Sequence, residues 1–159
     1  VHTVRYDDIT CYRLEDCLDL DGDVLEGAVA RILDGGYRVV LKPIPGAGPV
    51  LRRIGEATGR ILMVTARPEP GPIQQWMNQL LDGQHHRARI VATGSFEGKT
   101  DVLKENGVKW FVEDRLETCH LLDAAGIAPV VFRQPWNRAP HDYLQVESWQ
   151  ELERWIAFP

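Results

Sequence analysis

The stretch Ile61-Leu62-Met63-Val64, followed by Thr65-Ala66-Arg67, decides the class of fold. A short continuous apolar run that ends at a polar residue is typical of a strand buried in a parallel sheet. Apolar residues recur at helical spacing on both sides of this run, over 50–57 before it and 73–81 after it. The sequence therefore predicts a buried strand between two helices, with Gly59 ending the first helix.

The alternation of strands and helices continues along the chain. Further buried strands are predicted at 89–92, 110–112 and 129–132, and helices at 99–106, 116–125 and 149–156. This order requires right-handed crossovers and a parallel sheet covered by helices on both faces. We therefore expect a doubly wound α/β fold.

One stretch near the N-terminus breaks the alternation. Residues 24–33 and 37–41 are β-rich runs, and they flank Asp34-Gly35-Gly36, which contains a pair of residues typical of hairpin turns. We therefore predict a β-hairpin over 24–41. With 159 residues and no linker or internal repeat, the chain is expected to form a single domain over 1–159.

The composition limits the classes of partner. Lys and Arg number 18 against 23 acidic residues, for a net charge of −5, so a nucleic acid polymer is not expected as a partner. Without an apolar stretch near the ~20 residues that span a bilayer, or a signal peptide, we expect a cytoplasmic protein without membrane contact. Cys11, Cys17 and Cys119 are expected to be reduced thiols. The sequence carries no signal for an oligomeric state.

Polar residues at the carboxyl ends of the predicted strands are the candidates for chemistry, because ligands of open parallel sheets bind there. They are Asp19-Leu20-Asp21-Gly22-Asp23, Thr65-Ala66-Arg67, Lys99 and Glu113-Asp114. Two acidic pairs on neighbouring strands form an oxygen site suited to Mg²⁺. A hydroxyl, a backbone N–H and a lysine opposite them would hold a phosphate. Together they predict a phosphoryl-transfer centre.

A family resemblance rests on the order of these motifs. An Asp-x-Asp-Gly motif, a strand ending in Thr, a Lys and a strand ending in an acidic pair resemble the haloacid dehalogenase (HAD) superfamily of Mg²⁺-dependent phosphatases. Four local motifs are similar to its bacterial 5′(3′)-deoxyribonucleotidase-like branch: Pro43-Ile44-Pro45-Gly46-Ala47, Val64-Thr65-Ala66-Arg67-Pro68, Phe111-Val112-Glu113-Asp114-Arg115 and Gln134-Pro135-Trp136-Asn137-Arg138. The resemblance implies a HAD-like Rossmannoid sheet, the hairpin 24–41 as a flap over the site, and a small cap or none.

The resemblance also implies the roles of the acidic residues. Asp19 would be the nucleophile that forms an aspartyl-phosphate, and Asp21 would be the general acid/base. Asp114 would hold Mg²⁺ together with the Asp19 carboxylate and the Asp21 backbone carbonyl. Glu113 would be the second-shell partner of Asp114.

The phosphate-binding residues follow from the same resemblance. The Thr65 hydroxyl and the Ala66 backbone N–H would take phosphate oxygens, and Lys99 would neutralise the charge on the phosphate and the nucleophile. The expected activity is that of a phosphoric monoester hydrolase. Its substrate would be a small phosphorylated molecule such as a nucleoside monophosphate.

A second register remains open at the first motif. The family has Thr or Val where this chain has Asp23, and the strand expected before Asp19, over 13–18, carries three charged residues. If 1–4 is instead the first strand, Tyr6 replaces the nucleophile, and Asp8 and Thr10 stand at the second-acid and Thr positions. In that register the chain is a catalytically degenerate HAD-like domain with a binding or regulatory role.

Overall fold

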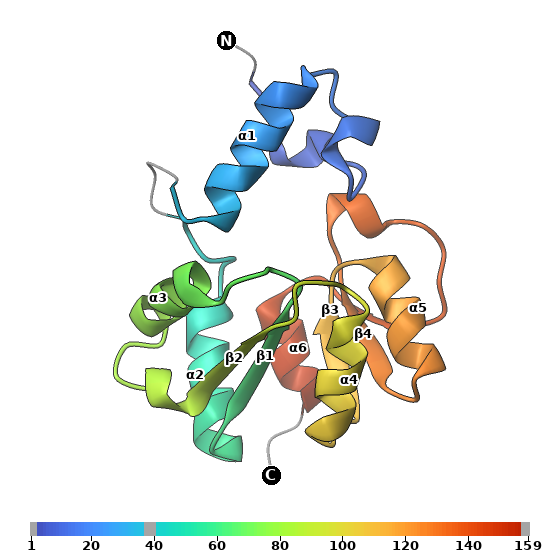
Figure 1. Ribbon diagram of the computed structural model, residues 1–159. Coiled ribbons are helices and arrows are strands. Elements are labelled where there is room, and N and C mark those ends of the chain that lie inside the picture. Colours follow the sequence, from blue (N-terminus) through green and yellow to red (C-terminus); the bar gives the residue numbers. More distant parts are fainter. Residues whose placement is uncertain (1–2, 37–40, 157–159) are drawn as a thin grey trace. The chain divides into compact units, whose positions relative to one another are not determined.

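The apolar runs of the sequence form parallel strands that belong to two sheets (Figure 1). The computed structural model describes residues 3–36 and 41–156. The chain divides into two compact units, each made of two separate stretches. The first unit contains Val1–Gly36 and Lys109–Glu147, and the second contains Tyr37–Val108 and Ser148–Pro159. The single domain expected over 1–159 stays a prediction.

The sheet of the second unit is a parallel pair of strands. β1 (Ile61–Thr65) pairs with β2 (Ala88–Ala92) from Ile61 opposite Ala88 to Thr65 opposite Ala92. The crossover between them contains α3 (Gly71–Leu80) and the 3-10 turn η3 (His85–Arg87). Both strands and the helix between them agree with the sequence pattern. Because the strands are parallel, Thr65 and Ala92 lie at the same carboxyl edge.

Three more helices complete the second unit. α2 (Ala47–Thr58) contacts β1 and α6 (Trp149–Ile156), and α4 (Gly98–Glu105) also contacts β1. The core of this unit is apolar, and its buried members are Leu51, Ile61, Met77 and Leu81. α2 ends at Gly59, which has a φ of 75°. This left-handed conformation is the one that glycine adopts most readily, so the predicted end of the helix is confirmed.

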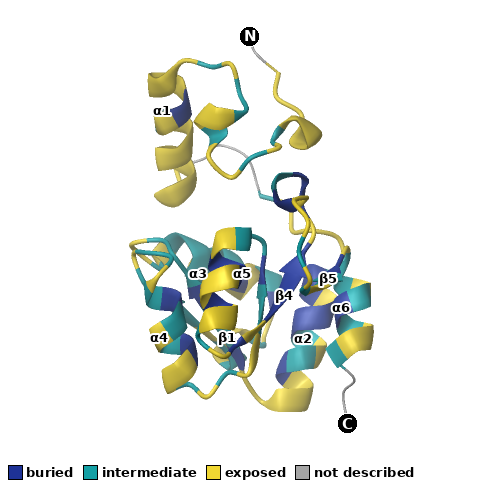
Figure 2. Ribbon diagram, turned by 90° about the vertical axis from the view of Figure 1, so that its right-hand side faces the viewer, coloured by how far each residue is buried: buried dark blue, intermediate teal, exposed yellow. Residues whose placement is uncertain are grey.

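The sheet of the first unit has the order β3-β4-β5, and all of its strands are parallel. These strands are β3 (Trp110–Glu113), β4 (Ala128–Phe132) and β5 (Leu144–Val146). α5 (Leu116–Ala124) lies in the crossover between β3 and β4, and it packs against β4. Residues 129–132 of β4 are buried (Figure 2). The sequence pattern predicted β3, α5 and β4, but not the short strand β5.

The N-terminal part of the first unit corrects the predicted hairpin. Residues 24–33 belong to the helix α1 (Gly22–Leu33), so the strand predicted there is wrong. The reason is visible in the sequence, where Leu25, Ala28 and Ile32 recur at helical spacing after the N-cap residue Asp21. Gly35 has a φ of 80° and follows the helix end, where it acts as a helix stop rather than a hairpin turn.

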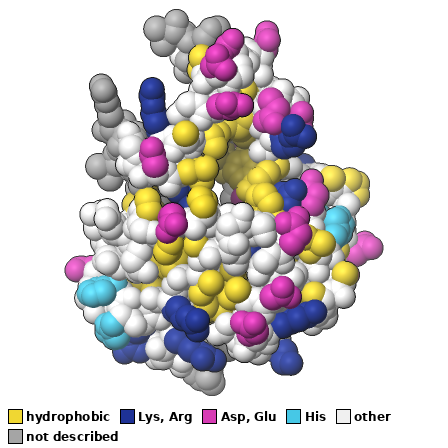
Figure 3. All heavy atoms as spheres, viewed as in Figure 1, with side chains coloured by type: hydrophobic (Ala, Val, Ile, Leu, Met, Phe, Trp, Pro, Cys, Tyr) yellow, Lys and Arg dark blue, Asp and Glu magenta, His cyan; other side chains and the backbone are white. Residues whose placement is uncertain are grey.

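The second predicted strand of the hairpin, 37–41, lies almost entirely outside the described residues. The flap and the small or absent cap therefore stay predictions. α1 itself buries one side chain, Leu25, while Val24, Val29, Ile32 and Leu33 are exposed. Figure 3 shows exposed apolar side chains in yellow on this part of the chain.

The expected class of fold is confirmed at the level of its strands. The chain is an α/β protein with parallel strands in two sheets. One continuous doubly wound sheet is not among the described features. Within each unit, the polar residues at the carboxyl ends of the strands are placed by the parallel pairing.

Candidate functional site

The carboxyl end of β1 carries a hydroxyl in a tight turn. The half-buried Thr65 accepts a hydrogen bond at Oγ1 from the Arg67 N–H, at 3.3 Å. Its backbone carbonyl accepts from both the N–H and the hydroxyl of Thr93, at 2.9 and 3.0 Å. Thr93 directly follows β2. The loops after the two strands are therefore tied together, and they hold Thr65 and Ala66 at this edge.

Lys99 is buried in the same unit, with 7% of its surface exposed. It is the second residue of α4, which packs against β1, and its Nζ lies 5.8 Å from the centre of the Phe96 ring. The loop before α4 is closed by hydrogen bonds. The Gly98 N–H donates to Ser95 Oγ at 3.1 Å. The Thr93 hydroxyl shares its one proton between the Thr65 carbonyl and the Ser95 carbonyl, which is 2.6 Å from Oγ1.

The absence of a side chain at residue 98 allows this closed loop. A Cβ atom there would lie 3.2 Å from Thr93 Cβ and 3.3 Å from Ser95 Oγ. The sequence pattern found Thr65 and Lys99 but missed Thr93 and Ser95. Their signal was present, because Thr93 is the first polar residue after the predicted strand 89–92.

The acidic pair of the first unit lies at the carboxyl end of β3. Glu113 is 5% exposed, and its Oε1 accepts hydrogen bonds from the N–H groups of Asp114 and Arg115, at 3.1 and 3.2 Å. Asp114 is half-buried, and its backbone carbonyl accepts from Asn137 Nδ2 at 2.8 Å. Glu113 therefore holds the backbone at Asp114 and Arg115.

Two tyrosines of the N-terminal segment lie near this acidic pair. Tyr6 donates a hydrogen bond to Gln134 Oε1, and its ring meets the Trp136 ring edge-on, with centroids 5.8 Å apart. Partial burial raises the pKa of Tyr6, and the negative charge of Asp114 raises it further. Burial is also the main cause of the raised pKa of Tyr12, followed by the charge of Asp114.

Arg115 lies over the ring of Tyr12. Its guanidinium carbon is 5.2 Å from the ring centre, and its positive charge opposes the rise in the pKa of Tyr12. These contacts hold residues 6–12 against the end of β3 and against the 3-10 turn η4 (Pro135–Asn137). Sequence reasoning considered Tyr6 only as a replacement for the nucleophile and did not consider Tyr12.

Asp19 and Asp21 lie in the segment before α1, and both are exposed. Asp21 is the N-cap of α1, and its carboxylate accepts the Asp23 N–H at 3.0 Å. The strand expected over 13–18 is absent, because Leu14–Asp16 is the 3-10 turn η2. The charged residues that made this strand a poor candidate are exposed in the structure.

The other register also lacks its strand in the part of the chain that the structure describes. Thr3 and Val4 are in no strand, Tyr6–Asp8 is the 3-10 turn η1, and residues 1–2 are outside the described ranges. Asp8 accepts the Arg5 N–H at 2.9 Å. Within 3–36 and 41–156, no three His, Cys, Asp or Glu side chains are gathered as a metal site. The call for Mg²⁺ has two carboxylates, Asp19 and Asp114, and the Asp21 backbone carbonyl, so this metal site stays a prediction.

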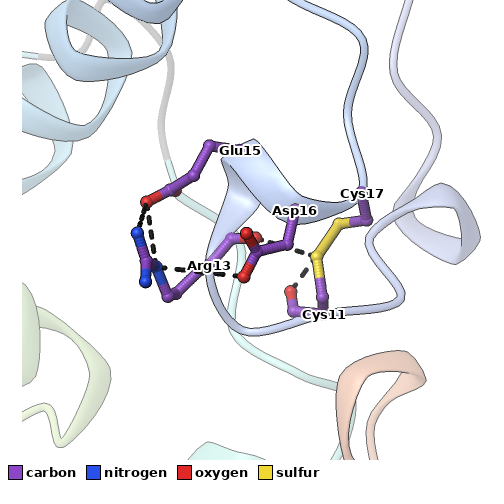
Figure 4. The surroundings of a disulfide bond; sticks show 5 residues. All are labelled: Cys11, Arg13, Glu15, Asp16 and Cys17. Carbon is purple, nitrogen blue, oxygen red and sulfur yellow. Dashed lines mark hydrogen bonds and ion pairs between the residues drawn. A yellow bond between two sulfur atoms is a disulfide. The ribbon is translucent and has the colours of Figure 1, made fainter.

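The cysteines of the N-terminal segment differ from the expectation of reduced thiols. Cys11 and Cys17 form a disulfide around the loop that contains η2 (Figure 4). Arg13 lies in this loop, and its guanidinium bonds Glu15 at 2.9 Å and approaches Asp16 at 3.9 Å. Three cysteines, an odd number, do not by themselves indicate a disulfide framework. The third cysteine, Cys119, is free and buried in α5.

The described structure thus defines an α/β protein of the Rossmann-like kind. One parallel strand ends in a hydroxyl and packs against a helix that carries a buried lysine, and another strand ends in an acidic pair. A family model described as "5' nucleotidase, deoxy (Pyrimidine), cytosolic type C protein" (NT5C) matches residues 29–158. The chain belongs to this family, and so to the nucleotidase-like branch of the HAD superfamily. No curated protein and no solved structure matches the chain.

The family match covers some of the candidate residues and not others. Thr65, Lys99 and Asp114 lie inside residues 29–158, whereas Asp19 and Tyr6 lie before residue 29. The choice between the two registers therefore rests on the sequence pattern and on local geometry. No helix among the described residues is long and apolar enough to cross a membrane.

Proposed function

We propose that the chain is a Mg²⁺-dependent phosphatase that hydrolyses a deoxynucleoside monophosphate. The observation that carries the proposal is the buried Lys99, on a helix packed against the strand that ends at Thr65. An ammonium group carried on this helix is a suitable counter-charge for a phosphate bound at the end of the strand. Family membership over residues 29–158 supports the same chemistry, since it implies nucleotidase or phosphatase activity.

The residues of the second unit are assigned to the phosphate. The Thr65 hydroxyl and the Ala66 N–H donate hydrogen bonds to phosphate oxygens, and the Lys99 ammonium neutralises their charge. Donors fixed in place before the substrate arrives stabilise the charge of the transition state without reorganisation. The hydrogen bonds of Thr93 and Ser95 supply this rigidity.

The residues around Asp114 fit a magnesium ion. Mg²⁺ in phosphoryl-transfer proteins is held by one or two carboxylates, with water and substrate oxygens as its other ligands. Asp114 offers one half-buried carboxylate whose backbone is fixed on both sides. Asp19 and the Asp21 carbonyl are proposed as further ligands. When bound, the ion would offset charge on the phosphate oxygens.

The bond-making steps are assigned to Asp19 and Asp21 from the sequence pattern. A carboxylate oxygen of Asp19 attacks phosphorus, and the bond from phosphorus to the nucleoside oxygen breaks as Asp21 gives that oxygen a proton. Asp21 then takes a proton from water, which attacks the aspartyl-phosphate. Inorganic phosphate leaves, and the Asp19 carboxylate is restored.

A direct test is the hydrolysis of a deoxynucleoside monophosphate by the full chain with and without Mg²⁺. We expect turnover with Mg²⁺ only, and a loss of about 10⁴-fold or more in Asp19→Asn, because a covalent nucleophile is removed. Asp114→Asn should also abolish turnover and any thermal shift caused by Mg²⁺. Asp8→Asn and the exposed Asp123→Asn are matched controls that should retain turnover.

A second candidate function is favoured by the position of Tyr6. Burial raises the pKa of Tyr6, and the negative charge of Asp114 raises it further, while the Tyr6 hydroxyl donates to Gln134 Oε1. In this alternative the chain binds a nucleotide without hydrolysing it. Calorimetric binding of a deoxynucleoside monophosphate by a wild-type chain that shows no turnover would select this alternative and reject the phosphatase.

A further inference from the structure

Asn137 is a buried side chain that hydrogen-bonds next to the acidic pair. It is the last residue of η4 and is 1% exposed. Its Nδ2 donates to the backbone carbonyls of Asp114 and Phe132, at 2.8 and 2.9 Å. Its Oδ1 accepts the Gln134 N–H at 2.8 Å. One amide thus uses both of its donors and its acceptor to join the ends of β3 and β4 to the start of η4.

The consequence for Asp114 is that its backbone is held from two sides. Its N–H donates to the buried carboxylate of Glu113, and its carbonyl accepts from the buried amide of Asn137. These two peptide planes fix the direction of the Asp114 Cα–Cβ bond, and with it the point from which the carboxylate extends. Asp114 is therefore oriented by side chains that lie outside the strand ladder.

We propose that Asn137 is a positioning residue, which sets the orientation of the Asp114 carboxylate for binding a divalent cation. The proposal rests on the proposed function, in which Asp114 is a metal ligand. Outer groups that orient metal ligands typically contribute 10–100-fold to metal affinity or activity. Only an amide fits all of the contacts, since an aspartate here would place carboxylate oxygens against the Asp114 and Phe132 carbonyls.

The competing explanation is that Asn137 only stabilises the turn after β4. The two explanations predict different results for two variants of η4. Asn137→Asp keeps the size of the side chain but removes both donors to the carbonyls. Pro135→Ala is the matched control, because Pro135 is buried in the same turn and makes no hydrogen bond to Asp114. Asn137→Ser, with a smaller polar side chain, replaces Asn137→Asp if the latter does not fold.

The experiment measures Mg²⁺ binding by the full chain through the thermal shift with Mg²⁺ alone, and also the Mg²⁺ concentration for half-maximal hydrolysis. We expect both midpoints to rise about 10-fold or more in the Asn137 variant at a temperature where it is folded. Pro135→Ala should lower the melting temperature and leave both midpoints unchanged. A folded Asn137 variant with the wild-type Mg²⁺ midpoint would overturn the proposal.

A second readout separates this proposal from the proposed function. Native-state hydrogen exchange at the amides of Asp114 and Arg115, which both donate to Glu113, reports the backbone order directly. We expect faster exchange at these two amides in the Asn137 variant but not in Pro135→Ala. A wild-type chain without Mg²⁺-dependent hydrolysis would contradict the function. Unchanged exchange in a folded Asn137 variant would contradict the positioning role.

Discussion

Lys99 shows how one buried charge identifies a candidate ligand site. From sequence it is a single lysine at the start of the helix predicted over 99–106, and lysines are usually solvent-exposed. In the structure its ammonium group is carried by the first turn of α4, beside the Phe96 ring. The dipole of a helix N-terminus favours anions in the same place as the lysine does. The two effects together make this position suited to a phosphate.

Replacement of Lys99 should weaken the interaction with phosphate without destabilising the fold. We expect Lys99→Met to lower the turnover of a deoxynucleoside monophosphate by about 10²–10³-fold, as for other single donors to a charged transition state. The thioether side chain retains the apolar packing, so the melting temperature should change little. Lys104→Met, on the exposed face of the same helix, should keep full turnover. Equal turnover in both variants would remove Lys99 from the site.

The environment of Tyr12 gives the chain an alkaline pH dependence. Burial and the charges of Asp114 and Glu113 raise the pKa of Tyr12 above its ordinary value of 10.0. A raised pKa in the folded state means that folding favours the protonated phenol. This contribution to the free energy of unfolding is complete below pH 10.0 and is lost as the pH rises through the folded pKa.

Urea unfolding at neutral and alkaline pH measures this effect. The free energy of unfolding of the wild-type chain should fall more steeply above pH 10.0 than that of Tyr12→Phe, which has no phenol to ionise. At neutral pH the two chains should show the same slope with pH. If the slopes also match above pH 10.0, neither burial nor the acidic pair raises the pKa of Tyr12 in the folded chain.

At the scale of elements, the N-terminus of α1 contains a residue with two possible roles, helix cap and catalytic acid/base. Asp21 is assigned the acid/base role by the resemblance, and in the structure its carboxylate caps α1 through the Asp23 N–H. A capping carboxylate is engaged in a structural hydrogen bond, which differs from the free acid that protonates a leaving group. Variants that keep or remove the cap can distinguish the two roles.

Two substitutions at Asp21 make that distinction. Asp21→Ala should lower the free energy of unfolding by about 1 kcal/mol, whereas Asp21→Ser should lower it much less, because serine is also a good N-cap. If Asp21 is the general acid/base, both variants should lose turnover by the same factor. If Asp21→Ser is fully active and only the less stable Asp21→Ala loses turnover, Asp21 acts only as the helix cap.

At the scale of the whole molecule, each compact unit has fully buried leucines of its own. Leu81 of the second unit and Leu122 of the first are both 0% exposed. Leu81→Ala and Leu122→Ala should each lower the free energy of unfolding by about 2–5 kcal/mol, measured by urea unfolding. Leu144→Ala, at a position that is 41% exposed, is the control and should cost about 0.5 kcal/mol or less. A small effect of either core variant would show that its unit is loosely packed.

The part of the fold that could be predicted from sequence is the part with strong local patterns. The continuous apolar run ending at Thr65 forms β1, and the apolar residues at helical spacing before Gly59 form α2. Local pattern failed at 24–33, where β-branched residues and a Gly-Gly pair indicated a hairpin. The helical spacing from Leu25 to Ile32 and the cap at Asp21 formed α1 instead.

By itself, the sequence determined the parallel α/β class and the polar residues at strand ends, because strand burial and the carboxyl-edge rule depend on local order along the chain. Only the tertiary structure decided which side chains meet. The contact of Asn137 with Asp114 and the contact of Tyr6 with Gln134 join residues far apart in the sequence, and no periodicity encodes such pairs. Asn137 became a candidate only when folding buried its amide, since a buried amide must satisfy its donors on whichever carbonyls the fold brings to it.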